Sequence, residues 1–271
     1  MSVKYAMWLQ YQIDANWTSP VIFVLYNTLK PVGGSLLLLA MYYVVTGGLL
    51  GDDALYFLYI GNAFYMLVSQ TLFSVGWIIH DDREHFQIMT YLYIAPMSYF
   101  VYLIGRSAMR FLLSILPLVV LVVIGIFIGV PYKVDYLLLT VTFVLGWVFT
   151  ISAGLLLCGI NMLTARHGES VGQAFSGIFY LFSGVIFPIA VLPAWAGRFS
   201  LCLPSTYWFS LVRRSVLGGE IDSVMMRYTT GEVAVILLVI SVVFFVISYL
   251  AYRLADFLAR KKGILDMTTT Y

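Results

Sequence analysis

The densest group of chemically reactive side chains lies in one short run, His80-Asp81-Asp82-Arg83-Glu84-His85. Imidazole and carboxylate groups together can hold a metal ion or transfer protons. A spacing of five residues places His80 and His85 on different faces of a helix, however, and Arg83 stands between them. Three interpretations stay open: a metal site of a membrane enzyme, a polar cap on a membrane helix, and a docking surface for a partner, which we favour.

Two stripes of hydroxyl, amide, sulfur and aromatic side chains could line a path for an amphipathic molecule. One stripe follows helical spacing along Ala54–Ile79, and the other lies along Ser170–Gly197. Close packing of helices through small and hydroxyl residues explains the same pattern equally well. Both explanations hold together if the path forms at a subunit interface. The stripe residues are Asn62, Met66, Ser69, Phe73, Ser176, Tyr180, Ser183 and Phe187.

Several familiar catalytic motifs are missing from the sequence. It contains no GxxxxGK[ST] loop to hold ATP phosphates, and neither HExxH nor GxSxG. No charged residue interrupts the middle of the long apolar runs, which disfavours an ion-coupled secondary transporter because such carriers use buried ionisable groups. We keep that carrier as the alternative function, and a metalloenzyme as a weaker one.

The composition identifies the environment in which these groups work. Of 271 residues, 62% are hydrophobic and 10% are charged, and the mean hydropathy is +0.95. Soluble domains have roughly 45–50% apolar and about 25% charged residues, so this chain cannot cover a soluble surface. A net charge of +2 gives no reason to expect nucleic acid as a partner, and two cysteines provide no disulfide framework. We therefore predict an all-α polytopic membrane protein.

Six apolar runs are long enough to cross the hydrocarbon core, which requires about 20 residues. A further run, Phe86–Gly105, is rich in tyrosine and contains Pro96, so we expect a helix along the membrane surface that is broken at Pro96. A seventh span is the alternative. The predicted spans cover residues 31–51, 54–79, 106–130, 136–164, 171–191 and 232–252, within a single domain over residues 1–271.

Two other segments are predicted to lie at the membrane surface or to dip into it. Residues 1–29 mix Trp8 and Ile13 with Gln10 and Asp14, which is typical of an interfacial helix, and we expect Lys30-Pro31 to open the first span. Residues 192–218 are too apolar for a solvated loop, and prolines divide them. We expect a pair of external re-entrant helices there.

The distribution of basic residues predicts the orientation. With six spans, ten of the fifteen Lys and Arg residues lie on the side of both termini. The positive-inside rule then makes both termini cytoplasmic. We expect a multi-pass protein of the plasma (inner) membrane, with Arg260-Lys261-Lys262 anchored on anionic lipid.

Three features resemble the membrane subunit of ABC transporters of the ABC-2 (type V exporter) family. The first is the run from Asp82 through Thr90 to Ile94-Ala95-Pro96 and Gly105-Arg106, which is similar to the family's first coupling helix, although Met89 replaces a frequent glycine. The second is Phe182–Pro188 followed by Leu192-Pro193 and Leu203-Pro204. The third is the N-terminal interfacial helix, which this family calls the connecting helix.

The resemblance implies an exporter permease that moves an amphipathic or lipid-like substrate outward by alternating access. A separate cytoplasmic ABC ATPase would bind ATP and Mg, so this chain would be neither an enzyme nor a cofactor protein. A second copy or a similar permease would complete the dimer. The coupling helix would cover residues 81–96, and residues 166–169 would make a secondary contact. The docking residues would be Asp82, Arg83, Glu84, His85, Gln87 and Thr90.

Overall fold

The computed structural model of the chain describes residues 3–16, 18–47, 52–164 and 168–264. Within these ranges the ordered elements are all helices and no strand is present. Five of the described helices are long and apolar enough to cross a membrane. They are α2 (Pro20–Val45), α3 (Asp53–His80), α5 (Tyr99–Ile128), α6 (Tyr136–Leu163) and α10 (Thr230–Lys262).

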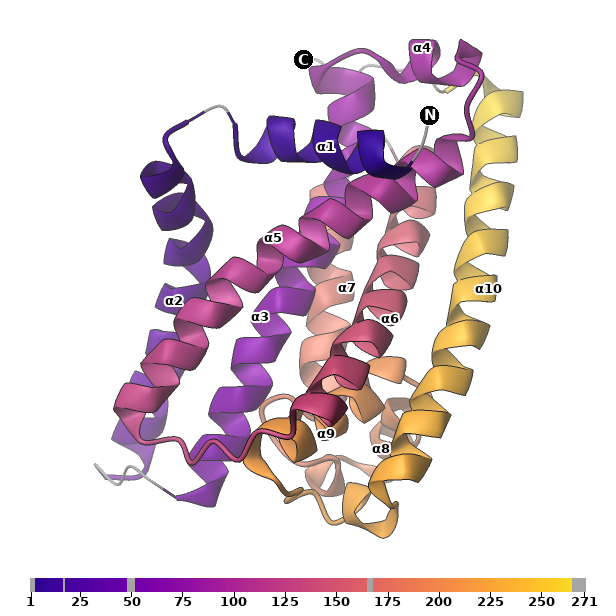
Figure 1. The fold of residues 1–271 in the computed structure, drawn as a ribbon. Coiled ribbons are helices and arrows are strands. Elements are labelled where there is room, and N and C mark those ends of the chain that lie inside the picture. Colours follow the sequence, from indigo (N-terminus) through magenta and orange to yellow (C-terminus); the bar gives the residue numbers. More distant parts are fainter. Residues whose placement is uncertain (1–2, 17, 48–51, 165–167, 265–271) are drawn as a thin grey trace.

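The shorter helices connect these five or lie across their ends. α1 runs across the long helices at the end of the bundle where α4 and the last turns of α10 also lie (Figure 1). α8 and α9 lie at the opposite end (Figure 1). The short elements are α1 (Val3–Asp14), the π-helix η1 (Asp81–His85), α4 (Met89–Ile94), α7 (Gly168–Phe182), η2 (Ile189–Val191), α8 (Ala194–Leu201), α9 (Pro204–Leu217) and η3 (Met225–Arg227).

Acidic side chains precede and cap two of the long helices, α3 and α6. Asp52 accepts a hydrogen bond from the Leu55 amide at 3.1 Å, and Asp135 accepts one from the Leu138 amide at 3.0 Å. Each carboxylate satisfies an amide that the first helical turn leaves without an intrahelical partner. The acidic residues between the apolar runs therefore define where α3 and α6 begin.

α2 contradicts the predicted boundary between an interfacial helix over residues 1–29 and a first span over residues 31–51. The helix starts at Pro20 and continues through Pro31 to Val45. Proline fits the first helical turn without loss of a hydrogen bond, and proline inside a membrane helix is tolerated where neighbouring groups satisfy the freed carbonyl. The separate N-terminal helix is thus α1 alone. Residues 1–2, 17 and 48–51 of the two predicted ranges lie outside the described residues.

The ranges 106–130 and 232–252 were predicted too short, because charged residues were used to delimit them. α5 begins at Tyr99, ahead of Arg106 and Arg110, and α10 continues past Arg253 to Lys262. The helices over residues 54–79 and 136–164 have nearly the predicted bounds, at Asp53–His80 and Tyr136–Leu163. Charged side chains in this protein therefore lie within helices as well as at their ends.

The predicted span over residues 171–191 is wrong as one continuous helix. α7 has 15 residues and ends at Phe182, so its length is about 22 Å against a hydrocarbon thickness of about 30 Å. Gly184 follows with a φ of 69°, a left-handed conformation that glycine adopts readily and that turns the chain away from the helix axis.

The segment after α3 also differs from the predicted helix over residues 81–96. η1 continues α3 to His85, Gln87 has a φ of 53°, and α4 then runs for six residues. α4 ends before Ala95-Pro96, where a break was predicted. A seventh span over Phe86–Gly105 is excluded, because six helical residues cannot cross a membrane.

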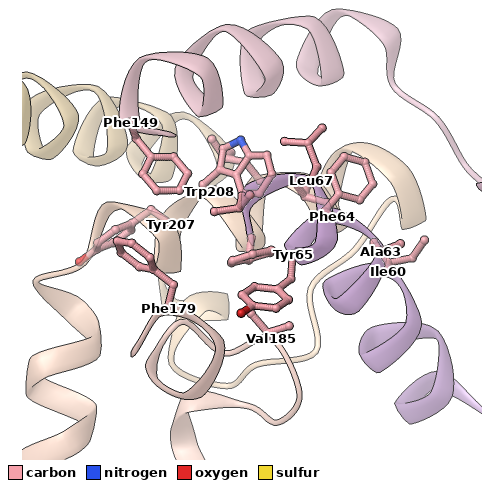
Figure 2. Close-up of a cluster of buried hydrophobic side chains, with 14 of the residues drawn as sticks. Ile60, Ala63, Phe64, Tyr65, Leu67, Phe149, Phe179, Val185, Tyr207 and Trp208 are labelled. Atoms are coloured by element: carbon pink, nitrogen blue, oxygen red, sulfur yellow. The ribbon is translucent and has the colours of Figure 1, made fainter. Parts of the chain in front are cut away.

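α9 lies inside the bundle rather than on its surface. Trp208 is fully buried, with its ring centre 6.0 Å from that of Phe64 and 5.8 Å from that of Phe149 (Figure 2). Its Nε1 donates a hydrogen bond to the Thr142 carbonyl at 2.8 Å. The indole N–H thus has a partner while the ring joins side chains from α3, α6 and α7. That α8 and α9 re-enter the outer leaflet stays a prediction.

Gly146 of α6 makes room for this tryptophan, so we expect Gly146→Ala to destabilise the protein by about 1–3 kcal/mol. A Cβ at this position would overlap the Trp208 indole, which has no free space to move into. The measurement is thermal unfolding of the purified chain in detergent. Gly33→Ala is the matched control, because nothing lies within 4 Å of its added Cβ. Equal melting temperatures for the two variants would contradict this account of the packing.

Candidate functional site

Five charged side chains form what we call the ionic network: Asp14 of α1, Asp81 and Asp82 of η1, and Arg106 and Arg110 of α5. Asp82 and Arg106 are fully buried and form an ion pair between Oδ1 and Nη1. Arg110 Nη2 lies 3.1 Å from Asp81 Oδ2 and 3.5 Å from Asp14 Oδ1. Removing one member of a buried ion pair strands the other charge at a cost of several kcal/mol. The network therefore fixes α1, η1 and α5 relative to one another.

Neutral side chains complete the surroundings of the central pair. The hydroxyls of Tyr99 and Tyr102 donate to the Asp82 carboxylate at 3.0 and 3.1 Å. Gln10 of α1 is also buried, and its side-chain oxygen accepts a hydrogen bond from Arg106 Nε. Gln10 and Asp14 of α1 thus face α5.

Gly105 allows α1 to lie directly against α5. A Cβ at Gly105 would come within 2.6 Å of the Ala6 Cβ and 2.8 Å of the Val3 carbonyl oxygen. The adjacent Arg106 then reaches the buried carboxylate. The Gly-Arg pair of the sequence therefore combines a close helix contact with an ion pair.

The predicted docking residues divide into two sets. Asp82 and Arg83 are buried within the chain, so they do not present a surface to a partner. The Glu84 side chain is largely enclosed, 3.5 Å from Arg83 Nη2 and 3.7 Å from His80 Nδ1. His85, Gln87 and Thr90 are exposed.

Large apolar side chains that sequence reasoning did not select lie beside these exposed residues. Phe86, Tyr91 and Ile94 have exposed fractions of 39%, 70% and 74%. Aromatic residues in an unusually exposed group are typical of interaction surfaces. We name the following exposed residues the docking edge: His85, Phe86, Gln87, Thr90, Tyr91 and Ile94.

The geometry does not favour the metal-enzyme interpretation of residues 80–85. The carboxylates of Asp82 and Glu84 contact arginine side chains, and His85 stacks edge-on against Phe86. Within the described part of the chain, no three His, Cys, Asp or Glu side chains gather as metal ligands.

The α3 stripe faces α2 over most of its length. Asn62 donates to the Ser35 hydroxyl at 2.8 Å, and the Lys30 ammonium lies 5.6 Å from the centre of the Phe73 ring. Met66 lies opposite Gly34, where a Cβ would be 3.2 Å from the methionine methyl group. These predicted path residues thus contribute to the contact between α2 and α3.

The structure brings together two of the other stripe residues. Ser176 of α7 donates to the Ser69 hydroxyl of α3 at 2.7 Å. Tyr65, which lies outside the predicted set, is 2.7 Å from the Ser176 hydroxyl, and its ring centre is 4.3 Å from that of Tyr180. Small hydroxyl residues that pair in this way are typical of helix packing in membranes.

The remaining two stripe residues follow α7 in the turn toward α9. The Ser183 hydroxyl lies 2.5 Å from the Ser205 hydroxyl and is buried, while Phe187 is partly exposed. Neither of them contacts the stripe on α3 through a hydrogen bond among those of the described residues. The eight predicted path residues therefore form separate contacts rather than one continuous lining.

Arg213 of α9 was not selected from the sequence, although an arginine inside an apolar stretch is a usable signal. It is buried, and its guanidinium lies 3.4 Å from the centre of the Phe57 ring. Its Nη2 donates to the carbonyls of Gly184 and Val185. The Ser-Gly-x-x-Phe-Pro turn is thus held by a cation that caps backbone oxygens.

We expect Asp82→Asn and Arg106→Gln each to lower the free energy of unfolding by about 3–5 kcal/mol, because each leaves a buried charge without its partner. The double variant should recover part of this loss, since it removes both charges. A double-mutant cycle of unfolding in detergent measures the coupling.

Asp53→Asn serves as the control for this cycle. It removes an exposed carboxylate from the first turn of α3, where such a group contributes about 0.3–1 kcal/mol. Simple additivity of the two network substitutions would show that Asp82 and Arg106 are not energetically coupled.

A comparison with known protein families identifies the class to which this arrangement belongs. A family model described as ABC-2 type transporter matches residues 4–217, which is most of the chain. No curated protein matches the chain at a significant level. This family provides membrane components of transport systems that are generally not catalytic themselves and generally pair with an ATPase subunit. The chain is a multi-pass membrane protein and belongs to the ABC-2 type transporter family.

Proposed function

We propose that the chain is the transmembrane permease subunit of an ATP-driven exporter and receives its energy from a separate ATPase at the docking edge. One observation carries this proposal: the exposed docking edge begins three residues after Asp82, which is locked to α5 by a buried ion pair. A partner that moves the edge would therefore also move the ends of α3 and α5.

A second contact links the same edge to α10. The Tyr93 hydroxyl of α4 donates to the Asp256 carboxylate at 2.6 Å, and Arg260 lies over the Tyr93 ring at 4.7 Å. Burial and this carboxylate raise the pKa of the Tyr93 phenol, so the hydroxyl keeps its proton at neutral pH and remains a donor. Displacement of α4 would therefore also move the ends of α3, α5 and α10.

In the proposed topology, both termini and the docking edge lie in the cytoplasm. α1 and the end of α10 lie at the same end of the bundle as α4, which supports this arrangement (Figure 1). α7 is too short to cross alone, and we propose that it completes a sixth crossing together with the folded-back segment of α8 and α9. Short helices and the irregular turns between them can lie at membrane depth when protein surrounds them, and most residues of α9 are buried.

We place the substrate path at the interface with a second copy or a similar permease. Ser69, Tyr180 and Phe187 remain partly exposed after the internal contacts form. Their hydroxyl and aromatic groups suit an amphipathic or lipid-like molecule, which presents both polar and apolar surfaces. Closure of the two ATPases would move the two permeases relative to each other, and the substrate would leave outward.

The docking edge should be needed for capture of the ATPase. Each ABC ATPase of the same cell that lacks a fused membrane domain would be co-expressed with the chain, and the amount that co-purifies in detergent would be measured. We expect Tyr91→Ser with Ile94→Ser to reduce the captured ATPase at least tenfold. Both side chains are exposed and apolar, so their loss weakens a contact without opening the core.

The control is an equally exposed pair at the other end of the bundle, Tyr136→Ser with Leu137→Ser. We expect this pair to leave capture unchanged. Undiminished capture by the docking-edge variant would contradict the proposed site. Flux through the chain in proteoliposomes driven by a proton or sodium gradient alone would contradict the proposed function.

A further inference from the structure

A polar cavity of about 450 Å³ lies between α4, the start of α5 and the last turns of α10. Its lining combines aromatic rings with a hydroxyl and charged groups. The groups used below are Tyr93, Ser98, Tyr249, Arg253, Asp256 and Arg260. The ionic network and the docking edge do not account for this cavity.

The charges in the cavity leave one cation without a carboxylate. Asp256 is paired with Arg260 at 3.0 Å and also accepts the Tyr93 hydroxyl. Arg253 takes part in none of the ion pairs among the described residues, and its guanidinium lies 6.0 Å from the centre of the Tyr249 ring. The two arginines and one carboxylate give this wall a net positive charge.

A hydroxyl donor, Ser98, lines the same cavity as these arginines. Ser98 precedes the first turn of α5, and its side chain makes no capping hydrogen bond to that helix. A guanidinium with several N–H groups and a nearby hydroxyl together provide the donors that a phosphate oxygen requires.

The position of Arg253 along α10 matches the level of phospholipid headgroups. About 20 residues without an Asp, Glu, Lys or Arg precede it, from Val233 to Tyr252. At about 1.5 Å per residue they cover about 30 Å, the thickness of the hydrocarbon core. The guanidinium therefore lies where the hydrocarbon region ends.

An apolar face of α10 lies beside the cavity. Leu250, Leu254 and Phe257 follow helical spacing and have exposed fractions of 59%, 60% and 60%. Acyl chains can lie along such a face while a headgroup occupies the cavity. A free phosphate has no acyl chains to bury on this apolar face, so the surroundings favour a lipid over a soluble anion.

We propose that this cavity binds the phosphate headgroup of an anionic phospholipid, with Arg253 as the principal contact. Tyr93 and Asp256 hold α4 and α10 at the separation that the headgroup requires. The site depends on insertion of α10 in the membrane and not on the proposed ATPase, and it differs from the nonspecific attraction of Arg260-Lys261-Lys262 for a negative surface.

The test uses the full chain, purified in detergent without any ATPase, and phosphatidylglycerol as the probe. Retained lipid would be counted by native mass spectrometry over a range of added phosphatidylglycerol. We expect Arg253→Gln to raise the apparent Kd about tenfold and Arg253→Lys to restore part of the affinity. Lys262→Gln removes the same charge from an exposed position outside the cavity and should leave the Kd unchanged.

Each other outcome overturns the proposal in a defined way. Equal weakening by Lys262→Gln would show that only surface charge attracts the lipid. An unchanged Kd in Arg253→Gln would remove the arginine from the site. Protection against thermal unfolding by inorganic phosphate that depends on Arg253 would assign the cavity to a soluble anion. Since no ATPase is present, failure here leaves the proposed permease function untouched, and failure of ATPase capture leaves this site untouched.

Discussion

The buried ion pair between Asp82 and Arg106 is the constraint on which the arrangement of this end of the protein depends. Two charges removed from water must each find a partner, and the partners come from different elements. The carboxylate fixes η1, the guanidinium fixes α5, and Gln10 holds α1 against α5. Only three residues separate η1 from α4, so the position of the docking edge is a consequence of the same pair.

At the opposite end of the molecule, a helix that contains polar residues is buried. α9 contains an indole N–H and the guanidinium of Arg213, and both donate to backbone carbonyls. Gly146 and Gly61 provide the space for these two side chains, since a Cβ on either would overlap or crowd them. The result is a densely packed end of the bundle in which α9 lies against α3, α6 and α10.

Much of the fold could be predicted from the sequence because apolar length determines where a chain can cross a membrane. The family was recognisable from the run around Asp82 and the Ser-Gly-x-x-Phe-Pro turn, and the match over residues 4–217 confirms it. The errors have two causes. Charge density suggests an exposed surface, whereas Asp82 is buried against Arg106, far away in the sequence, and Arg83 is buried beside its neighbour Glu84. Pro31 suggests a helix boundary in the sequence, although a membrane helix can continue through proline, as α2 does.

The π-helical turn at Asp81–His85 makes the length of this segment as important as its composition. A π turn contains one residue more than the α-helical turn it replaces. Winding the same residues as α-helix instead would carry that extra residue into the next turn and rotate everything that follows by about 100° relative to α3. The same side chains would then point in other directions, with the docking edge turned away from its present face. The segment therefore sets a rotational register between the bundle and its outer edge.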